Sequence, residues 1–243
     1  MRYLIGTSGY NYPEWRGSFY PEKLAAAKML GYYAERFNSV EVNYTFYRIP
    51  TEKLLQGWAA GTPAGFTFTL KAPRRITHDA KLRNVADLTQ TFCRTAATLG
   101  TKLGVLLFQL PPTFKRDDAV FTAFLDVIPD ATRAAFEFRH PSWHDDEIFA
   151  ALRRRNLALC IADSEKMSTP VVPTADYTYF RLRDEGYQKP DIERWAQTVR
   201  SLDAAQGAHV YFKHEEQGKG PEFAALLMSL LGIGTPYPTT GQT

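Results

Sequence analysis

Residues 136–143 read FEFRHPSW, which places an acid, a guanidinium, an imidazole and an indole at the end of one predicted strand. Side chains alternate between the two faces of a strand, so Glu137 and Arg139 share one face while Phe136 and Phe138 share the other. A strand that lies between a cavity and a layer of helices is expected to carry one polar and one aromatic face. The stretch therefore predicts such a strand, with the rest of the chain as its scaffold.

Eight β-rich runs, this one included, recur along the chain at the spacing of one βα unit, with helical patterns between them. This alternation predicts a parallel sheet covered by helices. Eight units in 243 residues are what an α/β protein of the (β/α)8 TIM-barrel class needs. We expect a single domain over residues 1–231 and a tail rich in Gly, Pro and Thr over residues 232–243. The predicted strands cover residues 3–6, 40–43, 66–70, 103–109, 133–138, 158–162, 177–182 and 209–212.

Helical patterns occupy all but one of the intervals between these runs. Thr51 is a candidate N-cap, and Gly100 is a candidate stop. Pro170 and Pro173 interrupt residues 164–176, so that interval is expected to hold only a short or irregular connection. The predicted helices cover residues 22–37, 51–60, 85–99, 117–127, 145–155, 191–205 and 221–231.

The composition is that of an ordinary globular protein, and its net charge of +3 is too small to dictate a polyanionic partner. Two cysteines, Cys93 and Cys160, provide no disulfide framework, so a reducing cytoplasm is expected. The N-terminal segment reaches Gly6 too soon for a signal sequence, and no apolar run approaches membrane-spanning length. We therefore expect a cytoplasmic protein without a membrane partner.

Polar side chains recur at the C-terminal ends of the predicted strands. If the apolar face of each strand is covered by helices, these side chains point into the barrel at the end where barrel active sites are built. Any single one could be structural, and Glu137 could simply bridge to Arg181 or Lys71. Burial of the whole set without a task would cost several kcal/mol. The set is Glu41, Asn43, Lys71, Gln109, Glu137, Arg139, Asp163 (paired in parity with Ile161), Arg181, Arg183 and Lys213.

Cations outnumber acids in this region, once Arg74 and Arg75 after the third strand are included. Arginines offer planar, paired donors that match phosphate or carboxylate groups. The expected ligand is therefore a small anion, either phosphorylated, sugar-like or nucleotide-like.

Less specific candidates lie on the predicted loops. His78 would supply acid–base chemistry near neutral pH or anchor its loop. Tyr10 and Trp15 could line a pocket, although core packing is the more common role of aromatic residues. Ser8 lies in a GTSG turn without the signature of a nucleophile. His140 is a candidate for substrate binding, although its parity points it away from the interior.

A metal site has suitable ligand types but no supporting pattern. No HxH or HExxH pair occurs, and the surrounding cations oppose a dication, so we expect neither a metal nor another cofactor. The residues of suitable type are Glu41, His78, Glu137, His140, Asp163 and His214.

These segments together resemble the YecE-like family of uncharacterised proteins, a domain of unknown function (number 72) with a TIM-barrel fold. The resemblance covers nearly the whole chain and implies a TIM barrel, but it implies no activity. It departs from many relatives at Phe212-Lys213-His214, where they carry Phe-Asn-Asn, so the resemblance assigns no role to Lys213 or His214. An outline similarity to the endonuclease IV and xylose isomerase group suggests nucleic-acid or sugar chemistry by analogy. The matching motifs are GTSGY at 6–10, NSVEVN at 38–43, QLPP at 109–112, EFRHPSW at 137–143 and RLR at 181–183.

The sequence therefore predicts an enzyme, a metal-independent acid–base lyase, isomerase or hydrolase that acts on a small anionic substrate. The predicted catalytic residues are Glu137, Lys71, Asp163 and His78. Two alternatives stay open: nucleic-acid binding or processing along the basic mouth, and a non-catalytic small-molecule sensor. The predicted substrate-binding residues are Arg139, Arg181, Arg183, Asn43, Glu41, Gln109, Lys213, Tyr10, Trp15 and His140.

Overall fold

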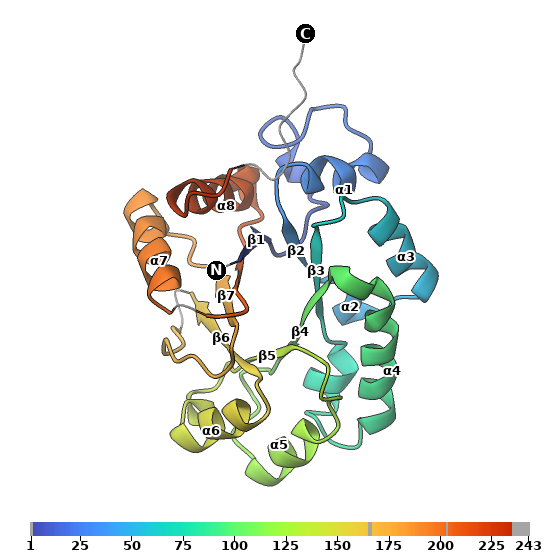
Figure 1. Cartoon of the computed structure of the whole chain (residues 1–243), viewed down its shortest axis with the longest axis vertical. Coiled ribbons are helices and arrows are strands. Elements are labelled where there is room, and N and C mark those ends of the chain that lie inside the picture. The colour runs from blue at the N-terminus through green and yellow to red at the C-terminus, as the bar shows by residue number, and fades with distance from the viewer. Residues whose placement is uncertain (1, 165–166, 203, 235–243) are drawn as a thin grey trace.

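The structure, a computed structural model, describes residues 2–164, 167–202 and 204–234. Eight parallel strands form a nearly closed barrel with helices around it, as Figure 1 shows. Every strand overlaps its predicted run with ends that differ by at most one residue, so the predicted (β/α)8 TIM barrel is confirmed. The strands are β1 (Tyr3–Thr7), β2 (Ser39–Val42), β3 (Thr67–Lys71), β4 (Leu103–Gln109), β5 (Ala134–Glu137), β6 (Ala158–Asp163), β7 (Thr178–Leu182) and β8 (Ala208–Phe212).

The predicted helices are present, most of them a few residues shorter than predicted. Thr51 caps α3 as expected, because its side chain accepts a hydrogen bond from the Leu54 amide. No helix lies in the described part of the β6–β7 connection, and no described helix is long and apolar enough to span a membrane. The helices are α1 (Ala26–Ala34), α2 (Tyr44–Tyr47), α3 (Glu52–Ala60), α4 (Ala86–Ala96), α5 (Asp118–Leu125), α6 (Asp146–Arg154), α7 (Lys189–Ser201) and α8 (Lys219–Leu230).

Five shorter helical turns complete the described elements, and most of the predicted tail lies outside the described residues. The turn that follows α4 contains Gly100 with a φ of 57°, a conformation that favours glycine and ends the helical run. The turns are Pro13–Trp15, the π-helical Arg75–Asp79, Ala97–Lys102, Pro141–Trp143 and Glu216–Gly218.

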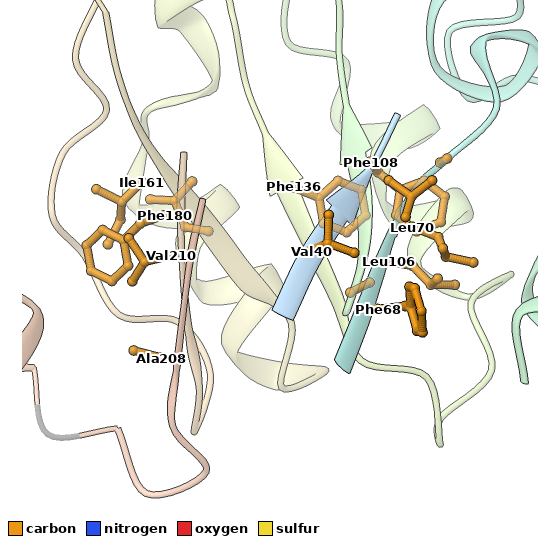
Figure 2. Close-up of a cluster of buried hydrophobic side chains, with 14 of the residues drawn as sticks. Val40, Phe68, Leu70, Leu106, Phe108, Phe136, Ile161, Phe180, Ala208 and Val210 are labelled. Atoms are coloured by element: carbon orange, nitrogen blue, oxygen red, sulfur yellow. The ribbon is translucent and has the colours of Figure 1, made fainter. Parts of the chain in front are cut away.

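The main core lies between the outer faces of the strands and the helices (Figure 2). Phe136 and Phe138 of the FEFRHPSW stretch both point into it. The chain turns back after His140 and stacks the Trp143 ring on Phe138, with a centroid distance of 5.1 Å. Trp143 is fully buried, and its Nε1 donates to the carbonyl of Phe114 at 2.7 Å. The aromatic face of this strand therefore points toward the helices, as predicted.

A second, smaller cluster fills the barrel interior, and it corrects the predicted orientation of β6. Cys160 and Ala162 pair in register with Tyr179 and Arg181 of β7, which point inward, so they point inward as well. Ile161 packs against the helices instead. The prediction that Ile161 and Asp163 share the inward face was wrong, because both faces of β6 are apolar and alternation gives no direction.

The barrel closes between β1 and β2, where side chains take the place of a regular ladder. A single bridge joins Ser8 to Glu41. Lower in the seam, Asn38 donates from Nδ2 to the carbonyl of Tyr3 at 2.8 Å and accepts at Oδ1 from the amide of Ile5 at 2.8 Å. One amide side chain thus satisfies two backbone groups of β1 that would otherwise lack partners.

The Tyr33 hydroxyl joins the same two strands higher in the seam. It accepts a hydrogen bond from the Thr7 amide at 2.7 Å and donates to the carbonyl of Ser39 at 3.1 Å. A Cβ on Gly6 would lie 1.9 Å from the Ser39 oxygen, so only glycine permits this close approach. The first strand is therefore held to the second by side chains from outside the sheet.

We predict that Asn38→Ala destabilises the protein, because it leaves the Tyr3 carbonyl and the Ile5 amide without their partners. Loss of partners for two partly buried backbone groups should lower the free energy of unfolding by about 2–4 kcal/mol, measured by urea denaturation. Asn38→Asp retains the acceptor for the Ile5 amide, so its free energy of unfolding should lie between those of the natural protein and Asn38→Ala. Asn11→Ala, an exposed site, is the matched control. Equal stability of the two alanine variants would show that the seam does not depend on Asn38.

Candidate functional site

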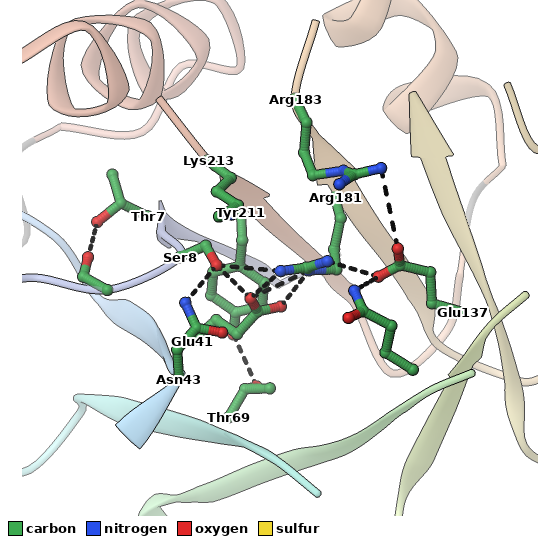
Figure 3. Close-up of polar contacts among 12 residues, drawn as sticks. Thr7, Ser8, Glu41, Asn43, Thr69, Glu137, Arg181, Arg183, Tyr211 and Lys213 are labelled. Carbon is green, nitrogen blue, oxygen red and sulfur yellow. Dashed lines mark hydrogen bonds and ion pairs between the residues drawn. The ribbon is translucent and has the colours of Figure 1, made fainter. Parts of the chain in front are cut away.

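The C-terminal end of the barrel interior holds six buried polar side chains that contact one another, and we call them the inner network (Figure 3). They come from four strands, β2, β4, β5 and β7, and from the turn after β1. Each is 2 % exposed or less, so the network is closed to solvent. Its members are Ser8, Glu41, Gln109, Glu137, Tyr179 and Arg181.

Glu41 is surrounded by donors. Its Oε1 accepts from Ser8 Oγ at 2.5 Å, and its Oε2 accepts from the Tyr179 hydroxyl at 2.5 Å. Arg181 donates to both oxygens, from Nε at 2.9–3.0 Å and from Nη2 at 2.9 Å. Four donors from three residues therefore hold this carboxylate in one orientation.

Glu137 is held in a similar way on the other side of Arg181. Its Oε2 accepts from Arg181 Nη1 at 2.5 Å and from Gln109 Nε2 at 2.7 Å, and its Oε1 accepts from Arg139 Nε at 2.8 Å. Arg183 Nη2 lies 4.0 Å from the same Oε1. The ion pair with Arg181 that the sequence left open as a structural alternative is present.

Both carboxylates are held in the ionised form. Burial alone would raise the pKa of Glu137, but the positive charges of Arg181, Arg139 and Arg183 outweigh burial and hold the pKa well below its usual range. Burial would also raise the pKa of Glu41, but the charge of Arg181 and the hydrogen bonds to this carboxylate outweigh burial and lower the pKa. Their oxygens are fully engaged, so these acids serve here as fixed negative charges and not as free proton acceptors.

A second group of cations lies just outside the inner network, and we call Lys71, Arg139 and Arg183 the outer cations. They follow or end β3, β5 and β7, and all are partly exposed. Arg139 uses only Nε, on Glu137, so its two terminal nitrogens have no partner among the described residues. Arg183 Nε is buried and also lacks one. These donors are therefore available to an anion.

Lys71 differs from the arginines because its charge can change. Burial lowers its pKa to about 7, and the charge of Arg181 acts in the same direction. Its Nζ lies 4.1 Å from the centre of the Phe46 ring, and no described residue offers it a hydrogen-bond acceptor. Lys71 therefore exchanges protons near neutral pH.

His78 lies next to Lys71, but its pKa is lower than that of the lysine. Its ring packs edge-on against Phe46 at 4.9 Å, and its Nδ1 lies 2.9 Å from Thr77 Oγ1. Burial, followed by the charge of Lys71, lowers its pKa to about 4. Of these two groups, only Lys71 therefore has a pKa near neutral pH.

Asn43 and Lys213 lie at the edge of the site. Asn43 Nδ2 donates to Ser8 Oγ at 2.9 Å. Lys213 Nζ lies 3.7 Å from Glu215 and is more exposed than the outer cations. Both flank the inner network at the ends of β2 and β8.

Four other sequence candidates lie away from the inner network. Asp163 accepts from Ser168 and Tyr187, and Trp15 is buried with its Nε1 bonded to the carbonyl of Glu215. The His140 ring accepts from the amide two residues later and caps a short turn. Tyr10 packs partly buried beside α1.

No three His, Cys, Asp or Glu side chains within the described ranges come together as potential metal ligands. Five of the six residues of suitable type make the contacts described above. The sixth, His214, lies with Nε2 2.7 Å from the carbonyl oxygen of Asp184.

Sequence reasoning missed the contribution of Tyr179 and Phe46. Tyr179 shares the inward parity of Arg181, and that parity was the available signal for its contact with Glu41. Phe46 lies in the four-residue helix α2 after β2, which is too short for a periodic pattern to predict its contact with Lys71. Ser8 was identified but rated as a plain turn residue, whereas its hydroxyl donates to Glu41.

We predict that Arg181→Met is strongly destabilising, because two buried carboxylates lose their shared cation. The free energy of unfolding should fall by about 3–5 kcal/mol, measured by urea denaturation at pH 7. Arg194→Met is the matched control, since that arginine pairs with Asp191 on the surface and should contribute less than about 1 kcal/mol.

The loss in free energy of unfolding caused by Arg181→Met, which we call the stability deficit, should also depend on pH. In the natural protein the lowered pKa values of Glu41 and Glu137 contribute stability that is present above their ordinary value of 4.5 and is lost as the pH falls. In the variant, burial favours the protonated acids. The deficit should therefore shrink between pH 7 and pH 4, and a constant deficit would contradict the ionised state of these acids.

Comparison with known proteins finds relatives over most of the chain. The UPF0759 protein YecE of Escherichia coli (strain K12) is 29 % identical over 194 residues, which is 77 % of this chain and 67 % of that protein. The UPF0759 protein YunF of Bacillus subtilis (strain 168) is 25 % identical over 219 residues, or 82 % of this chain and 77 % of that one.

Solved structures show the same fold. A DUF72 family protein from Thermotoga maritima MSB8 superposes with a TM-score of 0.84 at 25 % identity, covering 96 % of this chain and all of that chain. A DUF72 family protein from Enterococcus faecalis V583 gives a TM-score of 0.83 at 17 % identity and full coverage of both chains. The family described as "Protein of unknown function DUF72" matches residues 4–242, and the chain therefore belongs to that family.

Proposed function

We propose that this protein is an enzyme that binds a small anionic substrate at the C-terminal mouth of the barrel and transfers a proton through Lys71. The observation that carries the proposal is the division between the two layers of charge. The inner carboxylates are saturated by donors, whereas the outer cations keep donors without partners. An anion would complete the hydrogen bonding of this layer.

The balance of charge supports an anionic ligand. Arg139, Arg181 and Arg183 face Glu41 and Glu137, so one positive charge is left over before Lys71 is counted. Arginines retain their charge at every physiological pH, and their planar groups suit phosphate or carboxylate oxygens. A negatively charged group of the substrate would therefore be held at a fixed position.

Lys71 supplies the reactive group in this proposal. General acid–base catalysis is most efficient when the pKa of the group lies near the working pH, and Lys71 meets this condition with a pKa of about 7. Glu137 and Glu41 then fix the arginines that position the substrate. This proposal therefore assigns to Lys71 the proton transfer that the sequence suggested for Glu137.

The first test is the titration of Lys71 itself. Its acetylation rate, followed by mass spectrometry of peptides, should reach half its maximum near pH 7, because only the neutral amine reacts. Exposed lysines of the same molecule are the internal reference, since the ordinary lysine pKa is about 10.4. A pH profile for Lys71 that matches the exposed lysines would remove it as the proton-transfer group.

Stability should report the same shift with a defined sign. Above pH 7 the unfolded chain holds a proton on this lysine that the folded protein has lost, so the folded state gains stability as the pH rises. Relative to Lys71→Met, the natural protein should gain about 1.4 kcal/mol for each unit between pH 7.5 and pH 9. Below pH 7 the difference between the two proteins should be constant.

The second test is anion binding, measured by isothermal titration with inorganic phosphate and ribose 5-phosphate. Arg139→Ala and Arg183→Ala should each weaken binding about tenfold or more, since each removes charge-assisted hydrogen bonds. Arg194→Ala, on the surface, is the matched control and should bind as the natural protein does. Unchanged binding in the Arg139 and Arg183 variants would refute the site.

The same titrations distinguish the two alternatives. Tight binding of a single-stranded oligonucleotide, with an affinity that falls steeply as salt rises, would favour nucleic-acid binding instead. A saturable ligand that is always recovered unchanged would favour a sensor. Turnover that is lost in Lys71→Met, while the ligand still binds, would support the enzyme.

A further inference from the structure

The amine of Lys71 lies at the mouth of the barrel without a hydrogen-bond acceptor from the described residues. Lys71 shares the inward face of β3 with Thr69, whose hydroxyl lies 2.9 Å from that of Tyr211 in the barrel interior. An ammonium group has three N–H donors, and the only close partner of this one is the ring of Phe46. The side chain keeps part of its surface exposed. The donors of the ammonium form therefore depend on water or on a ligand.

The Phe46 ring covers one side of this amine. Its centre lies 4.1 Å from Nζ, and edge-to-face contacts with Tyr47 at 5.1 Å and His78 at 4.9 Å hold the ring in place. An aromatic face attracts a cation without accepting a conventional hydrogen bond. Burial lowers the pKa of Lys71 to about 7, so neutral and charged forms coexist at neutral pH. Desolvated lysines of this kind act as nucleophiles toward carbonyl groups.

Arg139 lies on the same side of the mouth as this amine. Only β4 separates β3 from β5, so the ends of these two strands lie about 10 Å apart. The charges of Lys71 and Arg139 both lower the pKa of His78, and the charge of Arg139 also lowers the pKa of Lys71. The two terminal nitrogens of Arg139 have no partner among the described residues. A reactive amine and an anion-binding group therefore lie within reach of one small molecule.

We infer that Lys71 forms a Schiff base with an aldehyde or ketone substrate whose phosphate or carboxylate group is held by Arg139. The inference rests on the proposed function, because it keeps the anion site and narrows the substrate to anionic carbonyl compounds. Lys71 then acts as a nucleophile in addition to its part in proton transfer. Three features in one place carry the inference: an amine without an acceptor, an aromatic ring over that amine, and unused donors on Arg139.

The covalent step balances without a co-reactant. After the ammonium form releases a proton, the neutral amine bonds to the carbonyl carbon, and one of its hydrogens moves to the carbonyl oxygen. The resulting hydroxyl takes up the released proton and leaves as water, while a C=N bond forms. The iminium keeps one hydrogen and one positive charge on its nitrogen. One N–H donor thus remains in place of three, which suits a nitrogen that faces an aromatic ring and has no acceptor.

The experiment traps the iminium by reduction. The full chain is incubated at pH 7 with sodium cyanoborohydride and one of four probes: glyceraldehyde 3-phosphate, dihydroxyacetone phosphate, pyruvate or uncharged glyceraldehyde. Hydride converts the iminium to a stable secondary amine, which mass spectrometry of peptides then locates. At least one anionic probe should label Lys71 about tenfold or more faster than the exposed Lys53, since an ordinary lysine is almost fully protonated at pH 7.

The Arg139→Ala variant tests whether the anionic group of the probe is held as inferred. Labelling of Lys71 by the anionic probe should fall about tenfold or more, toward the rate with glyceraldehyde, because the charge-assisted hydrogen bonds to the anion are lost. Labelling by glyceraldehyde itself should change little. Arg194→Ala, on the surface, is the matched control and should leave both rates unchanged.

The outcomes separate this inference from the proposed function. If no anionic probe labels Lys71 while inorganic phosphate still binds in a manner that requires Arg139, the Schiff base is overturned and the proposed function stands. If glyceraldehyde and the anionic probes label Lys71 at equal rates that Arg139→Ala does not change, the amine is reactive but the anion site fails, which overturns both. Absence of both labelling and phosphate binding would likewise refute both.

Discussion

The guanidinium of Arg181 lies between two buried carboxylates and is the charge on which the barrel interior depends. Glu41 comes from β2, Glu137 from β5 and Arg181 from β7, so the three side chains meet across the barrel. Removal of each charge from water costs several kcal/mol, and only close pairing with additional hydrogen bonds offsets that cost. Tyr179, Ser8 and Gln109 supply those bonds, since none of them adds a charge. The inner network thus carries two negative charges and one positive charge, and it is balanced only when Arg139, which pairs with Glu137, is counted.

The outer cations differ from Arg181 in the partners of their donors. Every guanidinium nitrogen of Arg181 donates within the inner network, whereas the outer cations keep donors without partners among the described residues. Glu137 accepts a hydrogen bond from Arg139 Nε alone, and the two terminal nitrogens of Arg139 have no partner among the described residues. Within the proposed function, the buried acid is a support that leaves these nitrogens for the substrate. Sites built on rigid strand ends and held by a second layer of hydrogen bonds lose little freedom on binding.

The sequence predicted the barrel well because each strand run contrasts with its flanks, and it predicted the site where polar residues interrupt an aromatic or apolar face. Glu137 and Arg181 belong to such strands, and Arg139 follows the first of them. Alternation failed at β6, where both faces are apolar, so the direction of Asp163 was lost. The barrel seam was not predictable either, because the role of Asn38 depends on a contact with β1 that only packing creates. Local patterns determine strands and parity, whereas contacts between loops and strands depend on the whole fold.

The pKa of Lys71 belongs to this last class, since burial and the arginines set it and no local motif does. Within the proposed function its value has a mechanistic consequence. An anion bound beside Lys71 adds an opposite charge, which favours the protonated amine and raises its pKa. Substrate binding near pH 7 would therefore draw a proton onto Lys71, and by linkage a protonated Lys71 would bind the anion more tightly. Arginines cannot take part in this exchange because they never lose their charge. Within the proposed function, the arginines therefore provide a constant positive charge, and Lys71 becomes an acid when the substrate binds.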